Sequence, residues 1–191
     1  MKKAVIILAE GFEEIEAFST IDVLRRAQIE CDMCSLNESK DNCVIGSHGI
    51  IVKTGKHLSD VNCKDYDCIV LPGGMKGTAN LKKSSGVLAL LSKFNENKKL
   101  IAAICAAPSV LAEAGIIKHK KVTSYPGFEK ELKDRIYCEE IVMQDGNIIT
   151  ARGAAASLYF AYKIAENLTS LKVVSKLRED MMINFVENKI R

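Results

Sequence analysis

The stretch that decides the fold is LIAAICAAPS, residues 100–109. Residues 100–104 are small or branched and apolar, which predicts a short strand buried on both faces. Pro108 suits the first turn of a helix, where its missing N–H costs nothing, and apolar residues continue at helical spacing up to Gly115. We therefore expect Cys105 at the point where a buried strand turns abruptly into a helix.

A thiol at such a turn faces unpaired backbone N–H groups and the positive end of a helix dipole, and both favour the thiolate. The same position also suits an inert residue, because free cysteine is commonly buried in protein cores. On this stretch alone, Cys105 is equally a nucleophile or a small core residue.

The composition is that of one globular domain. The chain has 191 residues, of which 48% are hydrophobic and 27% charged. A net charge of +3, with no basic run longer than two residues, gives no support for a nucleic-acid partner. No segment has the length that crossing a bilayer requires. We expect a single domain over residues 1–191, without a membrane segment.

Seven cysteines, an odd number at irregular spacing, do not form a disulfide framework. The apolar run after Met1-Lys2-Lys3 ends at Glu10, which is too short for a signal peptide. We expect a cytoplasmic protein with reduced thiols.

Strands and helices alternate along the rest of the chain, which predicts an α/β sandwich around a mainly parallel sheet. In such sheets, chemistry lies at the carboxyl ends of the strands. The expected strands are 4–9, 29–36, 68–71, 100–104 and 122–123, with an extended excursion or hairpin at 44–53 and a hairpin of 141–143 with 148–150. The expected helices are 13–27, 87–94, 108–114, 128–132, 154–168 and 171–187.

Three carboxylates follow the first expected strand. Glu13 and Glu14 are read mainly as acidic residues that stabilise the start of the next helix. Glu16 lies one turn beyond Glu13, beside Ile15 and Phe18, which we expect on the apolar side of that helix. Partial burial would raise the pKa of Glu16, and a neutral carboxylic acid next to a thiolate can donate a hydrogen bond and move a proton.

Two glycines, Gly73 and Gly74, directly follow the strand at 68–71. They suit either a plain turn or an oxyanion site, because glycine lets backbone N–H groups approach a ligand closely. Their position beside the turn at Cys105 favours the second interpretation.

Metal-binding patterns are absent from the sequence. Cys31 and Cys34 fall on an expected strand and so point to opposite faces, which favours a packing role. The three histidines, His48, His57 and His119, form no pair at helical spacing. We therefore expect no metal site.

Three motifs resemble the signatures of the ThiJ/PfpI superfamily, in the branch that contains YajL and the parkinsonism-associated protein deglycase. They are EEIE at 13–16, LPGGMKG at 71–77 and AAICAAP at 102–108. The wider similarity also includes IDVLRR at 21–26. The similarity keeps the same order over residues 3–168, and the final helix departs most.

The resemblance implies a flavodoxin-like three-layer sandwich, similar to class I glutamine amidotransferases, and a homodimer packed partly through the first helix. It implies Cys105 as nucleophile, Glu16 as its acid/base partner, and the N–H groups of Gly74 and Ala106 as oxyanion donors. It also places His48 where a basic residue can reach the site across a dimer. No metal or organic cofactor is implied.

The implied activity is glutathione-independent conversion of methylglyoxal or glyoxal, or removal of early glycation adducts, in oxidative and carbonyl stress. A redox sensor or chaperone-like protein, with Cys105 oxidised to sulfinate, is the alternative. Many relatives have a histidine where this chain has Tyr125, and a phenol is a poor base at pH 7. A thiol peptidase or amidase therefore ranks third, and proton transfer falls to Glu16.

Overall fold

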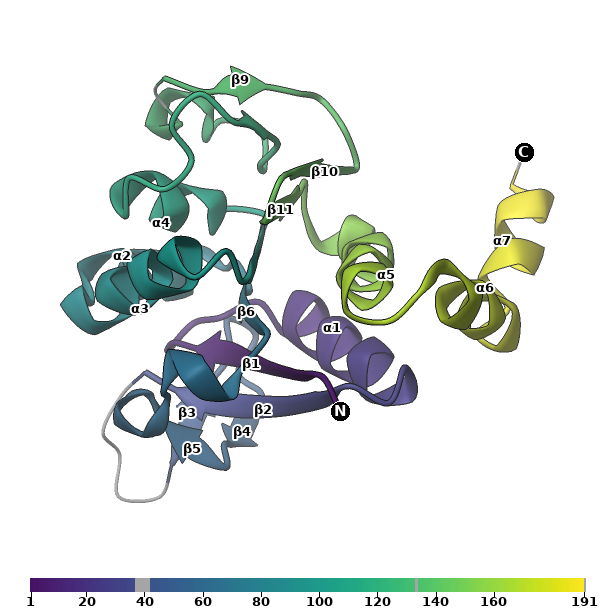
Figure 1. Cartoon of the computed structure of the whole chain (residues 1–191), viewed down its shortest axis with the longest axis horizontal. Coiled ribbons are helices and arrows are strands. Elements are labelled where there is room, and N and C mark those ends of the chain that lie inside the picture. The colour runs from purple at the N-terminus through teal and green to yellow at the C-terminus, as the bar shows by residue number, and fades with distance from the viewer. Residues whose placement is uncertain (37–41, 133, 191) are drawn as a thin grey trace.

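A seven-stranded sheet crosses the centre of the computed structural model, which describes residues 1–36, 42–132 and 134–190 (Figure 1). The strand order is β10-β11-β7-β6-β1-β2-β5, and every neighbouring pair is parallel except β10 with β11. The mainly parallel sheet expected from the sequence is confirmed. Its strands are β1 (Lys3–Leu8), β2 (Glu30–Ser35), β5 (Lys56–His57), β6 (Cys68–Leu71), β7 (Leu100–Ile104), β10 (Val142–Asp145) and β11 (Ile148–Ala151).

Helices cover both faces of the sheet and complete three layers (Figure 1). One face carries α1 (Glu14–Arg26), α5 (Ser157–Leu168) and, outside α5, α6 (Leu171–Asp180), whereas α2 (Met75–Lys83), α3 (Ser85–Glu96) and α4 (Pro108–Glu113) cover the other. Alternate residues of the central strands therefore enter two separate hydrophobic clusters. Cys31 joins the cluster under α1 and Cys34 the opposite one, so the expectation that they face apart is confirmed.

Helix α1 packs mainly on α5, and its buried side differs from the predicted one. Ile21 and Leu24 are buried, but Ile15, which we expected on the apolar side, is 58% exposed, while Glu14 and Glu16 are buried. The prediction for Ile15 was wrong because burial at the start of this helix is set by the neighbouring loops rather than by apolar spacing.

Two further differences concern helices. The sequence did not predict α2, whose buried residues are Gly77, Thr78 and Leu81. The expected helix 171–187 is broken at Met182, which has φ +61°, into α6 and α7 (Ile183–Lys189). Single 3₁₀ turns occupy Leu58–Asp60, Cys63–Asp65, Glu129–Glu131 and Ala154–Ala156.

Two small sheets flank the main one. Strands β8 (Lys121–Val122) and β9 (Ile136–Tyr137) pair in parallel, and β3 (Cys43–Ile45) forms an antiparallel hairpin with β4 (Ile51–Lys53). The hairpin is held at the carboxyl end of β1 by two backbone hydrogen bonds. Gly11 N–H donates to the Ile45 carbonyl, and Ser47 N–H donates to the Phe12 carbonyl. Within the described ranges, no helix has the length and apolar character needed to cross a bilayer.

Candidate active site

Cys105 lies in a strained turn between β7 and α4. Its φ is +63°, in the left-handed region that non-glycine residues rarely adopt and that costs about 1–3 kcal/mol. Two backbone hydrogen bonds hold this conformation: Cys105 N–H donates to Ala151 at 2.9 Å, and Tyr125 N–H donates to the Cys105 carbonyl at 2.8 Å. A residue held in this way at a strand–helix turn is typical of a nucleophile.

Glu16 is buried beside this turn, with 1% of the residue exposed. Its Oε2 accepts a hydrogen bond of 2.7 Å from Gly73 N–H. A side chain at Gly73 would place its Cβ 2.7 Å from Oε2 of Glu16 and 2.8 Å from Cβ of Cys105. Only glycine fits between the carboxyl and the thiol, which lie in direct contact with this position.

Burial raises the pKa of Glu16 to about 7, against the lowering effect of hydrogen bonds from Gly73 N–H and the Cys105 thiol. Glu16 is therefore half-protonated near neutral pH, as a proton carrier requires.

Burial also raises the pKa of the Cys105 thiol, to about 12, and the negative charge of Glu16 adds to the effect. The N–H groups of Ala106 and Gly74 act in the opposite direction. From the sequence we expected the helix dipole to favour the Cys105 thiolate. That expectation is wrong when Glu16 is ionised. Helix α4 is only six residues long, and burial together with an adjacent carboxylate outweighs its dipole.

The backbone N–H groups of Gly74 and Ala106 converge on the Cys105 sulfur. Gly74 has φ +88°, and a side chain there would collide with the Gly11 carbonyl. Gly73 differs from Gly74, because its N–H is directed at Glu16. Two donors near the sulfur form a site where negative charge on an adjacent oxygen would be stabilised.

Tyr125 is 51% exposed and follows the strand β8, where its backbone bond to Cys105 places it next to the site. Its ring lies against Gly153, with 3.3 Å between the ring and the position of a Cβ. The structure therefore brings Cys105, Glu16, Gly73, Gly74, Ala106 and Tyr125 together.

His48 belongs to a second group, at the turn of the β3–β4 hairpin. Its ring Nδ1 lies 2.7 Å from Oε2 of Glu14, and its backbone N–H donates to Oε1 of Glu14 at 2.7 Å. The Ser47 hydroxyl also donates to Oε2, at 2.9 Å. The imidazole is otherwise exposed, with 71% of the side chain accessible. Within the described chain, His48 is linked to Glu14 rather than to Cys105.

Burial alone would raise the pKa of Glu14, but hydrogen bonds from His48, its own backbone and Ser47 lower it to about 2. The hydrogen bond with Glu14 and the charge of that carboxylate raise the pKa of His48. From the sequence we interpreted Glu14 as a residue that stabilises the helix dipole, and we did not predict its pairing with His48. Glu13 does act at the helix start, because its carboxylate accepts from Glu16 N–H at 2.7 Å.

Candidate metal ligands gather at one place among the described residues, where Glu13, Glu14 and His48 each offer an atom within 4.8 Å of the others. Both oxygens of Glu14 already accept hydrogen bonds from His48, and one also accepts from Ser47. We therefore assign no metal to this group.

Comparisons with known proteins agree with this geometry. A model of the DJ-1/PfpI family matches residues 2–167. The chain is 40% identical to DJ-1alpha of Drosophila melanogaster, covering 95% of this chain and 84% of the relative, and 36% identical to the Parkinson disease protein 7 homolog of Danio rerio, covering 95% and 97%. The crystal structure of Drosophila melanogaster DJ-1beta superposes with a TM-score of 0.90 at 38% identity, covering 95% and 97%.

Proposed function

This chain belongs to the DJ-1/PfpI family, and from that starting point we propose that it is a cysteine-dependent, glutathione-independent glyoxalase or protein deglycase. Its substrates are methylglyoxal, glyoxal or early glycation adducts, and its role lies in oxidative and carbonyl stress. The observation that carries the proposal is the pair of Cys105 with a buried Glu16 whose pKa is about 7.

In the first step, the Cys105 sulfur adds to the aldehyde carbon of methylglyoxal and forms a hemithioacetal. The carbonyl oxygen gains the negative charge, and the N–H groups of Gly74 and Ala106, which point to the sulfur, are placed to stabilise it. The pair carries one negative charge above the pKa of Glu16. When the proton resides on Glu16, the thiolate loses the opposing charge that raises its pKa.

Glu16 then gives its proton to the hemithioacetal oxygen and becomes a carboxylate. In the second step, this carboxylate takes the proton from the hemithioacetal carbon and returns it to the neighbouring carbon, while the proton on the hemithioacetal oxygen moves to the neighbouring oxygen. The first carbon is thereby oxidised to a thioester and the second reduced to an alcohol, so no external oxidant or reductant takes part. Water then hydrolyses the thioester, which gives lactate and frees the thiol. Every proton transfer uses this chain's own carboxyl group, so the reaction requires no cofactor.

We further propose that two copies associate through α1 and the β3–β4 hairpin. Ile15, Ile45, Ile50 and Ile51 are exposed there, with Ile51 at 68%, and hydrogen bonds join the hairpin to the start of α1. An exposed group of large apolar residues favours a protein partner. In such a dimer, the exposed imidazole of His48 is the basic group available to the other copy. Neither nucleic acid nor a membrane is a proposed partner.

We place the protein in the cytoplasm on the state of its thiols. Free cysteines are typical of reducing compartments. The free thiols of the described chain include Cys31, Cys34, Cys63, Cys68, Cys105 and Cys138.

A second candidate is a redox sensor in which Cys105 is oxidised. A structure of oxidized Toxoplasma gondii DJ-1 superposes with a TM-score of 0.90 at 34% identity, covering 95% of this chain and 98% of that one. The carboxyl group of Glu16, when protonated, would donate a hydrogen bond to an oxidised sulfur. Peroxide titration with peptide mass spectrometry tests this role, and oxidation of other cysteines before Cys105 would exclude it.

The decisive experiment for the enzyme is lactate formation from methylglyoxal without glutathione. We expect repeated turnover by the wild type and loss of turnover in Cys105→Ala. Cys138→Ala is the matched control, because Cys138 is also half-buried but lies outside the site. Lactate no higher than the Cys105→Ala background would exclude the enzyme and leave the redox sensor.

A further inference from the structure

Hydrogen bonds hold the backbone of Cys105 from two sides. Its N–H donates to the Ala151 carbonyl at 2.9 Å, and its carbonyl accepts from Tyr125 N–H at 2.8 Å. Ala151 is the last residue of β11, whereas Tyr125 belongs to the loop that follows β8. A left-handed conformation at a non-glycine residue persists only when its surroundings fix it. The conformation of Cys105 therefore depends on how these two segments are held relative to each other.

One side chain joins the two segments. The Oγ1 of Thr150, the residue before Ala151, accepts a hydrogen bond of 2.9 Å from Thr123 N–H. Because Thr123 lies two residues before Tyr125, this bond closes a ring that begins and ends at Cys105. The other two hydrogen bonds of the ring join backbone groups, which any residue supplies. The hydroxyl of Thr150 is thus the part of the ring that the sequence chooses.

The bond between Thr150 and Thr123 is buried, since both residues are 0% exposed. A buried N–H that loses its acceptor receives no water in exchange, which makes the loss costly. Without the Thr150 hydroxyl, the loop would move to find another partner for Thr123 N–H. That movement would take Tyr125 N–H away from the Cys105 carbonyl.

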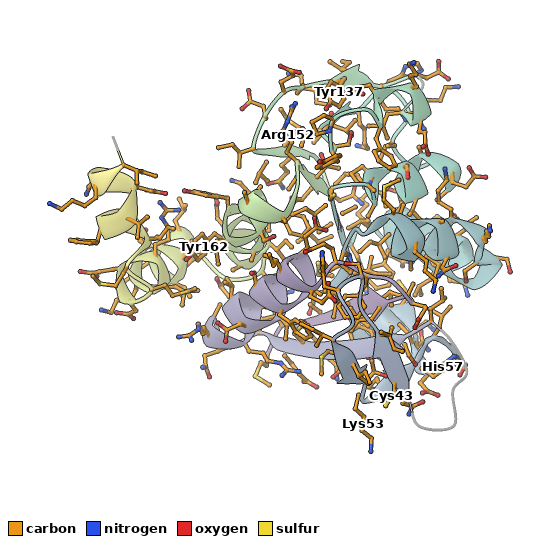
Figure 2. The ribbon with its side chains drawn as sticks, turned by 180° about the vertical axis from the view of Figure 1, so that it is seen from behind. Cys43, Lys53, His57, Tyr137, Arg152 and Tyr162 are labelled. Atoms are coloured by element: carbon orange, nitrogen blue, oxygen red, sulfur yellow. The ribbon has the colours of Figure 1, made fainter. Side chains whose placement is uncertain are left out.

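A second side chain supports the same loop from its outer side. The hydroxyl of Tyr137 donates to the Ser124 carbonyl at 3.2 Å. Figure 2 shows Tyr137 at the same end of the molecule as Arg152, the residue after Ala151, and far from Lys53. This bond is longer and less buried than the one at Thr150, so we expect a smaller effect from its loss.

We propose that Thr150 is a positioning residue for the nucleophile: its hydroxyl oxygen holds Cys105 in the left-handed conformation, and Tyr137 supports the same loop. In this conformation the sulfur accepts from the N–H groups of Gly74 and Ala106. Thr150 acts through the backbone and does not touch the substrate. The inference rests on the proposed function for turnover only, because alkylation of the Cys105 thiol is independent of it.

The first test measures alkylation of Cys105 by iodoacetamide at pH 7, with peptide mass spectrometry as the readout. Thr150→Val keeps the shape of the side chain and removes the acceptor. We expect Cys105 to react about tenfold more slowly in this variant, because the thiolate loses N–H groups that stabilise it. Thr150→Ser retains the hydroxyl and should react within about twofold of the wild type.

Thr54→Val is the matched control for loss of a buried threonine hydroxyl. Thr54 is 3% exposed, and its hydroxyl donates to the carbonyls of Asn42 and Lys56. It follows Lys53, at the other end of the molecule from Tyr137 (Figure 2). Thr54→Val should lower the stability and leave alkylation of Cys105 unchanged. A wild-type rate in Thr150→Val, an equal loss in Thr54→Val, or a Thr150→Ser variant as slow as Thr150→Val would overturn the proposal.

Tyr137→Phe decides the question if circular dichroism shows that Thr150→Val is unfolded. It removes one hydroxyl from a half-buried ring and should slow alkylation of Cys105 about threefold. An unchanged rate in Tyr137→Phe would then overturn the proposal.

The second test separates the positioning role from the enzyme. Thr150→Val should lower kcat for lactate formation from methylglyoxal about tenfold and change KM by less than about twofold, because it does not contact the substrate. Slow alkylation in Thr150→Val, with no turnover by the wild type, would exclude the proposed function and keep the positioning role. Equal turnover and equal alkylation in Thr150→Val and the wild type would keep the function and exclude the positioning role.

Discussion

Two carboxylates in the first turn of α1, Glu14 and Glu16, are buried in adjoining regions that shift their pKa values in opposite directions. Glu14 lies under the β3–β4 hairpin, where His48 and Ser47 donate hydrogen bonds to both oxygens. Glu16 lies under the Cys105 turn, where one backbone N–H, from Gly73, donates to one oxygen. The pKa is lowered to about 2 at Glu14 and raised to about 7 at Glu16.

Both residues are at most 4% exposed, but Glu16 lies deeper, and burial is the largest cause of its raised pKa, whereas hydrogen bonds from His48 and Ser47 outweigh burial at Glu14. A buried carboxylate with several donors and an imidazolium stays ionised and fixes a loop. A buried carboxylate with few donors and an adjacent thiol holds a proton that it can give away. The arrangement at Glu14 holds the hairpin in place, whereas the arrangement at Glu16 allows proton transfer.

The largest expected difference between Glu14 and Glu16 is in turnover. Glu16→Gln removes the proton carrier and should lower kcat for lactate formation by about 10²–10⁴. Glu14→Gln, two residues away, should lower it by less than about tenfold, because Glu14 does not contact the sulfur. Lactate assays on the two purified variants, with equal folded fractions, check this. Comparable losses would mean that Glu14 and Glu16 act together.

The pH dependence of kcat/KM sharpens the same contrast. Below the Glu16 pKa of about 7, the Cys105–Glu16 pair is fully protonated and has no nucleophile. We expect kcat/KM to fall about tenfold per pH unit below that value, and hence about a hundredfold from pH 7 to pH 5. Initial rates across pH 5–9 measure the profile. A flat profile would exclude Glu16 as the group that titrates.

Stability should depend on pH with opposite signs for the two residues. At Glu14 the pKa falls from 4.5 to about 2 on folding, so the unfolded chain binds more protons between these values. The stability it contributes, about 3 kcal/mol, is present above pH 4.5 and is lost as the pH falls towards 2.

At Glu16 the pKa rises from 4.5 to about 7, so the folded chain binds more protons and stability falls by a similar amount as the pH rises through this range. Glu14→Gln should therefore be destabilised at pH 5–8, and Glu16→Gln should be stabilised at pH 8 with little change at pH 4.5. Urea unfolding of both variants at these pH values provides the free energies. Slopes of the same sign would contradict the assignment.

The smallest expected change in stability concerns the two glycines that lie against these carboxylates. A Cβ at Gly46 would collide with the Glu14 carboxyl, and one at Gly73 would lie between Glu16 and Cys105. Gly46→Ala should cost about 1–3 kcal/mol of stability and retain turnover, whereas Gly73→Ala should cost a similar amount and lose turnover. Thermal unfolding and lactate assays on both variants measure this. A fully active Gly73→Ala would show that the pair tolerates separation.

The local pattern of apolar residues, proline and glycine in the sequence predicted the central part of the molecule well. The β7–Cys105–α4 turn, the buried strands and the amphipathic helix α3 all depend on apolar spacing, Pro108 and glycine, which act within a few residues. The helix α2 was missed because its buried side has small residues, such as Gly77, which packs on the Gly11–Phe12 backbone. The break at Met182 was missed because a positive φ at methionine has no signature in sequence.

The sequence predicted which residues lie close together around Cys105 but not their protonation states. Cys105, Glu16 and the glycine pair were recognised by their places at strand ends. The raised pKa of the thiol was not, because it depends on the burial of Cys105 and on the charge that Glu16 carries from a distant strand end. The Glu14–His48 pairing also joins segments 34 residues apart, and no local pattern reports it.

The order of the strands has a consequence for aggregation. Both edges of the sheet offer little backbone to another chain: β5 has two residues, and β10 is a four-residue antiparallel strand next to β8. Short edge strands prevent growth of a sheet from molecule to molecule. We therefore expect the sheet edges to contribute little to fibril formation when the protein is concentrated, and ordered contact between copies to use side chains on helices and on the hairpin.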